Sequence, residues 1–103
     1  MRDDYYELHA SLCGTFSSPK RLEILNLLRD GELTVTEIQE KMSISKTNLS
    51  QHLTMMKDRG ILKSRREGQH IYYSVVNEKV IQAYDLMSEV LRELIDKRMA
   101  QLG

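Results

Sequence analysis

Five side chains between residues 46 and 54 could form hydrogen bonds to the edges of DNA bases. They carry hydroxyl, amide or amine groups and are Lys46, Thr47, Ser50, Gln51 and Thr54. In a helix, a rotation of about 100° per residue places all five within an arc of about 140°. Three apolar side chains fall on the other side: Leu49, Leu53 and Met56. Such groups on one helix face are typical of base reading in the major groove.

A second polar group follows between residues 63 and 70. Its members are Lys63, Arg65, Arg66, Gln69 and His70. Residues 61–67 have strand character, and residues 69–76 are rich in β-branched and aromatic residues. With the Glu67-Gly68 turn between them, the two runs predict a β-hairpin. A basic hairpin tip beside a base-reading helix would hold backbone phosphates or reach a minor groove.

The charge distribution supports a phosphate-binding centre. The whole chain has a net charge of zero. Residues 41–70, however, hold seven Lys and Arg against two Asp and Glu, a net charge of +5. The segments before and after carry −4 and −1. A basic centre between acidic arms is the electrostatic pattern of a chain that binds nucleic acid through its middle.

The elements that position these residues can be read from caps and hydrophobic spacing. We expect helices at 3–16, 18–30, 34–42, 45–59 and 77–101, with a short strand possible between the second and third. Ser18 before Pro19, Thr34 with Glu37, and Ser45 are the predicted helix starts. The order predicts an α+β winged helix-turn-helix in one domain, 1–103. Residues 34–59 form the helix-turn-helix and 61–76 the wing.

The first and last helices are too apolar for helices with one buried side. The last helix has a heptad-like series: Val80, Tyr84, Met87, Leu91, Leu94 and Arg98. The first helix has two apolar stripes, Tyr5, Leu8 and Leu12 beside Tyr6, His9, Cys13 and Phe16. We therefore expect residues 1–16 and 77–101 to form the interface of a homodimer.

The composition excludes several other classes of protein. No apolar run reaches the ~18 residues of a membrane span, and the acidic N-terminus lacks the apolar core of a signal peptide. One cysteine forms no intrachain disulfide, so a cytoplasmic location is expected. The chain has no catalytic Ser/His/Asp set or glycine-rich phosphate loop, so we expect neither an enzyme nor a bound cofactor.

Several segments together resemble the ArsR/SmtB family of transcriptional regulators. They are 17–25, 31–38, the stretch SKTNLSQHL at 45–53, Gly60-Ile61-Leu62 and 65–75, and the resemblance covers about residues 8–76. It implies a homodimeric repressor that leaves its operator when an effector binds. It also implies that the first and last helices pair across the dimer. A dimer that inserts residues 46–54 into successive major grooves would need an imperfectly palindromic operator.

The chain departs from the family at its metal sites. Metal-sensing members carry Cys-Val-Cys in the third helix, where this chain has Thr34-Val35-Thr36, and a hydroxyl does not replace a thiolate. The last helix contains no histidine, so the second common site is absent as well. His9 and Cys13, one helical turn apart, form an alternative: two protomers could supply a tetrahedral metal set or a pair of sensor thiols.

The sequence therefore gives one leading hypothesis and two alternatives. The leading hypothesis is a sequence-specific repressor of double-stranded DNA, homodimeric, with no evident effector. The first alternative adds a metal or thiol response through Cys13 with His9. The second is a winged-helix interaction module that does not bind DNA.

Overall fold

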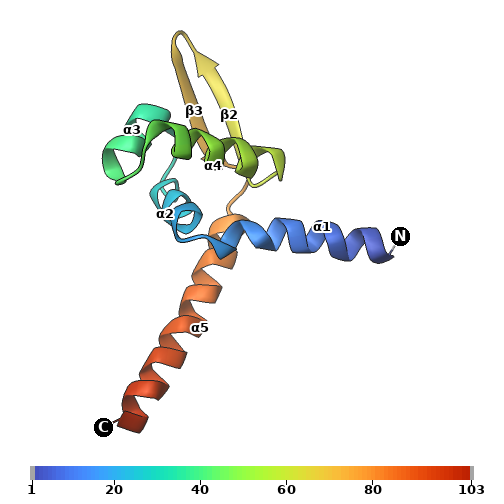
Figure 1. Cartoon of the computed structure of the whole chain (residues 1–103), viewed down its shortest axis with the longest axis vertical. Helices are drawn as coiled ribbons and strands as arrows, with labels where there is room; N and C mark the ends of the chain where they lie inside the picture. Colours follow the sequence, from blue (N-terminus) through green and yellow to red (C-terminus); the bar gives the residue numbers. More distant parts are fainter. Residues whose placement is uncertain (1, 103) are drawn as a thin grey trace.

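The computed structural model describes the backbone of residues 2–102 and the side chains of residues 4–102. Two long helices, α1 and α5, leave a central group of shorter elements in different directions, and a β-hairpin projects from the group (Figure 1). The elements in order are α1 Arg2–Gly14, the 3-10 turn η1 Thr15–Ser17, α2 Pro19–Leu27, β1 Leu33–Thr34, α3 Val35–Lys41, α4 Lys46–Asp58, β2 Leu62–Glu67, β3 His70–Val75 and α5 Lys79–Leu102.

The starts of three helices follow from the predicted caps. The Ser18 hydroxyl accepts a hydrogen bond from the Arg21 amide at 3.4 Å, and Pro19 occupies the first turn of α2. The Thr34 hydroxyl accepts from the Glu37 amide at 3.1 Å, while the Glu37 carboxylate accepts from the Thr34 amide at 2.9 Å. The hydroxyl of Ser45 accepts from the Asn48 amide at 3.1 Å. These bonds satisfy amides that a helix leaves unpaired in its first turn.

The core lies between α2, α3, α4 and the base of the hairpin. Its buried apolar side chains are Ile24, Leu25, Leu28, Ile38, Met42, Leu49, Leu53, Met56, Ile61, Leu62 and Val80. Leu49, Leu53 and Met56 are all at most 1% exposed. The apolar stripe predicted for the fourth helix is therefore the side of α4 that faces the core.

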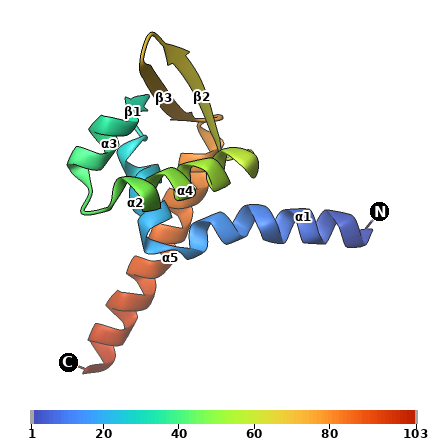
Figure 2. The ribbon, with the colours of Figure 1, turned by 45° about the horizontal axis from the view of Figure 1, so that its top comes forward.

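The sheet has three antiparallel strands in the order β1-β3-β2. Figure 2 shows the short β1 beside β3, where Leu33 and Thr34 pair with Tyr73 and Tyr72 in the middle of that strand. Gly68 has a φ of +62° in the hairpin turn, and Gly60 has a φ of +84° where the chain leaves α4 for β2. Both positions require a backbone conformation that costs glycine nothing and strains other residues. The wing thus follows α4 through a sharp turn.

The structure corrects several predicted boundaries. The first helix was expected to run to residue 16, but its α-helical part ends at Gly14 and a 3-10 turn follows. The second helix was expected to reach residue 30, but α2 ends at Leu27 and residues 28–30 form turns. The last helix starts at Lys79 rather than residue 77, and the Asn77 side chain accepts a hydrogen bond from the Lys79 amide at 2.8 Å.

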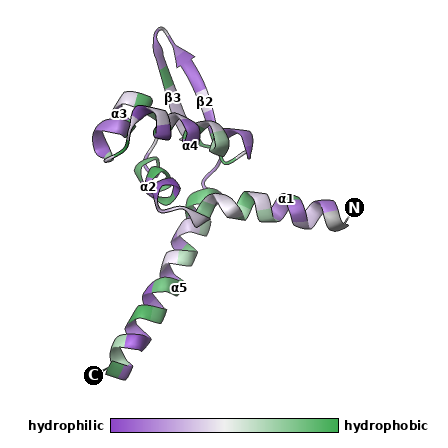
Figure 3. Cartoon of the chain, viewed as in Figure 1, coloured by the Kyte–Doolittle hydropathy of each residue, from purple (hydrophilic) through white to green (hydrophobic). Residues whose placement is uncertain are grey.

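The two long helices leave large apolar side chains in solvent. On α5, Met87, Leu91 and Leu94 of the predicted heptad series are 64%, 57% and 60% exposed. On α1, Tyr5, Tyr6 and Leu8 are at least 60% exposed. Figure 3 shows apolar residues recurring along the free length of α5. Among the described residues, no helix is long and apolar enough to span a membrane.

The position of α4 in the core predicts that substitutions on its two faces affect the free energy of unfolding very differently. Replacing the fully buried Leu49 with alanine should lower the free energy of unfolding by about 3 kcal/mol, because it removes apolar contacts and leaves a cavity. Replacing the exposed Gln51 with alanine should change it by less than about 0.5 kcal/mol. Urea unfolding at one fixed protein concentration measures both, and equal losses would contradict the assignment of the faces.

Candidate nucleic-acid interface

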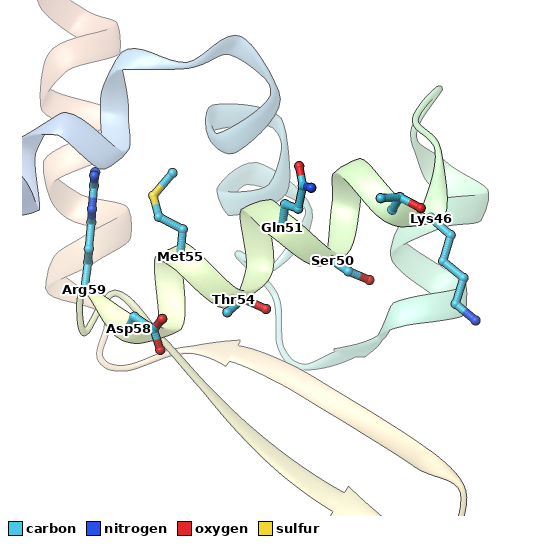
Figure 4. A pocket seen from close by; sticks show the side chains of 8 residues that line it. Lys46, Ser50, Gln51, Thr54, Met55, Asp58 and Arg59 are labelled. Atoms are coloured by element: carbon cyan, nitrogen blue, oxygen red, sulfur yellow. The ribbon is translucent and has the colours of Figure 1, made fainter.

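The five predicted base-reading side chains lie together on the exposed face of α4. None of them is buried, and all line one open groove with Met55, Asp58 and Arg59: Lys46, Thr47, Ser50, Gln51 and Thr54. Figure 4 shows these side chains along the length of the helix. Because the opposite stripe is held in the core, the helix cannot turn this face away from solvent.

A second groove lies between α4 and the hairpin. It brings Lys46, Ser50 and Thr54 together with Gln69 and His70 from the hairpin. The predicted helix and hairpin residues therefore share one continuous surface, although Lys63, Arg65 and Arg66 do not line this groove.

Two polar residues of α3 also line this second groove and were missed by the sequence analysis. They are Thr36, which is exposed, and Gln39, which is partly buried. Their polar side chains could have marked them as candidates, since amide and hydroxyl groups can contact phosphate or base edges. Their closeness to the hairpin depended on the packing of α3 against β3, which the sequence did not reveal.

The basic residues of the hairpin divide between its two faces. Successive side chains of a strand point to opposite faces, and directly paired residues share a face. Arg66 pairs with Ile71, and Ser64 pairs with Tyr73, so Arg66 lies on the face of Ile71 and Tyr73, which line the groove beside α4. Lys63 and Arg65 lie on the other face.

Arg65 is held on that other face by two carboxylates. Its guanidinium donates to both carboxylate oxygens of Glu32, at 2.6 and 2.8 Å, and to Glu67 at 2.7 Å. The guanidinium also lies over the ring of Tyr72, 4.3 Å from the ring centre. Since Glu32 precedes β1 and Tyr72 is on β3, Arg65 of β2 crosses the whole sheet. Its hydrogen bonds lower the pKa of the Glu32 carboxyl below its usual range.

Arg59 ties the end of α4 to the first helix. Its guanidinium donates to the Ser11 carbonyl at 3.3 Å, and Figure 4 shows the side chain extending toward α1. Arg21 of α2 donates to the carbonyls of Gly14 and Thr15, each at 3.1 Å. Cations at a helix C-terminus donate hydrogen bonds to the last carbonyls and interact favourably with the negative end of the helix dipole. These two arginines therefore hold the end of α1 against the core.

His52 lies on the side of α4 next to the apolar stripe and is partly buried. Burial lowers the pKa of its imidazole, and the positive charges of Arg21 and Lys20 lower it further. The neutral ring is thus favoured at neutral pH. This position suits packing within the unit rather than base reading.

His9 and Cys13 are exposed on α1. In the part of the chain that the structure describes, no three His, Cys, Asp or Glu side chains are grouped so that they could hold a metal ion. The His9 and Cys13 hypothesis requires a second protomer and stays a prediction.

Comparison with known proteins identifies the family of this chain. Residues 18–64 match the family model for bacterial regulatory proteins of the arsR family. The chain is 42% identical over 66 residues to the transcriptional repressor SdpR of Bacillus subtilis. These residues make up 64% of this chain and 72% of that protein. The chain is 32% identical to the nodulation protein NolR of Rhizobium meliloti, over 82% of this chain and 69% of that protein. The chain belongs to the ArsR family.

Solved structures of similar proteins establish the fold of this ArsR-family chain. The solution structure of the homodimeric winged helix-turn-helix DNA-binding domain of Mb0332 from Mycobacterium bovis has a TM-score of 0.85. The two chains are 28% identical, with coverage of 93% of this chain and 89% of that one. The crystal structure of Rv0081 from M. tuberculosis also gives 0.85, at 27% identity and with coverage of 92% and 96%. The predicted winged helix-turn-helix, with its short strand β1, is confirmed.

In this ArsR-family chain, the hydroxyl of Thr34 has a structural use. It is 9% exposed and caps α3 by accepting the Glu37 amide. This hydroxyl already serves as a cap, and hydroxyls are poor ligands for soft metals. The resemblance to the family therefore extends to its fold but not to the Cys-Val-Cys metal site.

The lowered pKa of His52 predicts a pH-dependent loss of stability. In the unfolded chain the imidazole titrates near its ordinary value of about 6.5, so below that pH the unfolded state binds a proton that the folded state resists. The free energy of unfolding should therefore fall between about pH 7 and pH 5, and fall less for His52→Gln. The lowered carboxyl pKa values of Glu32 and Asp85 act only at lower pH.

NMR titration of the histidine ring protons measures the same effect directly. The His52 midpoint should lie below about 6.5. A midpoint at or above that value, or an unchanged pH dependence in His52→Gln, would contradict the prediction.

Proposed function

We propose that this chain is a sequence-specific DNA-binding transcriptional regulator, acting as a repressor at a palindromic operator. Residues 34–59 act as the helix-turn-helix, and residues 61–76 as the wing of a single domain spanning residues 1–103. The observation that carries the proposal is the exposed face of α4, where Lys46, Thr47, Ser50, Gln51 and Thr54 lie opposite the buried stripe. Those residue types match the donors and acceptors of base edges in the major groove.

We infer that the regulator is a homodimer formed through α1 and α5. The support is the exposed apolar surface of both helices, which a partner copy would remove from water. An apolar groove between η1, α2 and α5, lined by Phe16, Leu22, Tyr84 and Leu91 among others, is continuous with that surface. A two-fold dimer would present two α4 helices to successive major grooves about 34 Å apart, which requires an imperfectly palindromic operator.

The remaining expectations belong to this proposal. A regulator that binds the chromosome works in the cytoplasm, and this function needs neither catalysis nor a resident cofactor. Any response to a metal or an oxidant would depend on Cys13, with His9 one turn away at the dimer interface. Comparing operator affinity of the wild type and Cys13→Ser with and without Zn(II) or peroxide distinguishes a regulator with this response from one without it.

The first test measures sequence-specific binding. The wild type should bind the region upstream of its own gene about 10³-fold more tightly than a scrambled duplex of the same composition, with affinity falling steeply as salt rises. Gln51→Ala should weaken operator binding by about 1–3 kcal/mol, because it removes an amide aimed at a base edge. Fluorescence anisotropy at several salt concentrations measures both.

The control is Gln82→Ala, which removes the same group from an exposed position on α5 and should leave DNA affinity unchanged. Equal binding of operator and scrambled duplex would rule out a sequence-specific regulator. Absence of any salt-sensitive binding would instead favour the interaction module.

The second test compares the contributions of Arg65 and Arg66 to phosphate binding. Arg66→Gln should reduce the slope of log affinity against log salt by about 1, since it removes a free cation from the face beside α4. Arg65→Gln should leave the slope nearly unchanged, because its guanidinium is occupied by Glu32 and Glu67. An equal loss of slope in both variants would mean that Arg65 leaves Glu32 to bind phosphate.

A further inference from the structure

The fifth helix leaves the core after only a short contact. Val80 at its start is buried, Tyr84 packs against the core, and Ser88 is the last residue of α5 that is partly buried. Every described residue from 89 to 102 is exposed, and Figure 1 shows this part of α5 projecting away from all other elements. The direction of the free part is therefore set by few contacts around residues 80–88.

One ion pair lies at the outer end of this contact. The guanidinium of Arg29, just after α2, donates to both carboxylate oxygens of Asp85 on α5, at 3.1 and 2.9 Å. A third bond from Arg29 to the Asn26 side chain, at 3.1 Å, holds the guanidinium in place. The same group lies 5.6 Å from the ring centre of Tyr84. A two-bond pair with a planar guanidinium fixes orientation as well as distance.

We propose that the Arg29–Asp85 pair sets the angle between the core and α5 and thereby the spacing of operator half-sites that the dimer accepts. Arg29 and Asp85 are positioning residues in this proposal and touch no DNA. The inference rests on the proposed function, since it requires two α4 helices joined through a dimer that includes α5.

Because α5 is long, a small change in its angle to the core displaces its far end by a large distance. At 1.5 Å per residue, the part of α5 from residue 85 to residue 102 is about 26 Å long. A tilt of about 10° at the pair moves the far end by about 4.5 Å, which exceeds the rise of about 3.4 Å per base pair. In a two-fold dimer the change occurs twice, so loss of the pair blurs or shifts the preferred half-site spacing.

Because the Arg29–Asp85 pair is partly exposed, its positioning role can be distinguished from a contribution to stability. The side chains are 32% and 49% exposed, and pairs in such positions add little to the free energy of unfolding. Other charges nearby do not replace it: Asp30 acts on Arg29 and Arg92 acts on Asp85 only at longer range. Within the described residues, neither Asp30 nor Arg92 forms an ion pair within 4.0 Å.

The test compares binding to operators whose half-sites are separated by the selected spacing or by one base pair more or less. For Asp85→Asn and Arg29→Gln, the ratio of affinities between the best and the altered spacing should fall about fivefold or more. The matched control Asp30→Asn removes the same charge beside Arg29 and should keep the wild-type ratio. The swap Arg29→Asp with Asp85→Arg rebuilds the pair and should recover most of the ratio.

A second measurement needs no DNA. A nitroxide on Lys57→Cys, in a Cys13→Ser background, reports the distance between the two α4 helices of the free dimer by pulsed electron spin resonance. Asp85→Asn should broaden or shift this distance, whereas Asp30→Asn should not.

The outcomes distinguish the two proposals. A wild type that binds no operator, with a distance distribution that still depends on Asp85, overturns the proposed function but supports the positioning role. An unchanged spacing ratio and an unchanged distance in Asp85→Asn overturn the positioning role. A uniform loss of affinity at all spacings also overturns it, as does a wild type that remains monomeric.

Discussion

The burial of one side of α4 is the constraint on which the rest of the interface depends. Leu49, Leu53 and Met56 are almost fully removed from water, and they contact the cluster that α2, α3 and the base of the hairpin form. Rotating α4 about its axis would expose these side chains at about 1.5–3 kcal/mol each. The polar face is therefore held toward solvent by the core, and its side chains need no partners of their own in the free protein.

A second consequence concerns the two long helices. The core is made mainly by α2, α3, α4 and the base of the hairpin, and most apolar residues of α1 and α5 remain exposed. Arg21 and Arg59 hold α1 at its end, while Arg29 and Asp85 hold α5 near its start. Polar contacts at the roots of both helices thus fix their directions and leave their apolar lengths available to a partner.

The position of the charged residues says more about DNA binding than the net charge of the chain does. The net charge is zero, yet the α4 and wing region carries the excess of positive charge. Within that region Arg65 is paired with Glu32 and Glu67, so its charge is already compensated. The free cations beside α4 are fewer than the sequence implies. The pairing instead links β2 to Tyr72 of β3 and to Glu32, the residue before β1.

The sequence by itself determined the starts of α2, α3 and α4, the hairpin and the exposed polar face of α4, because caps, turn glycines and hydrophobic period act over a few residues. It missed the early end of α2 and the 3-10 turn after Gly14, where packing competes with local propensity. Only the tertiary structure decided which wing arginine is free, because Glu32 and Arg65 meet across 33 positions of sequence. The same holds for Arg29 and Asp85, 56 positions apart, since long side chains choose partners only after the elements have packed.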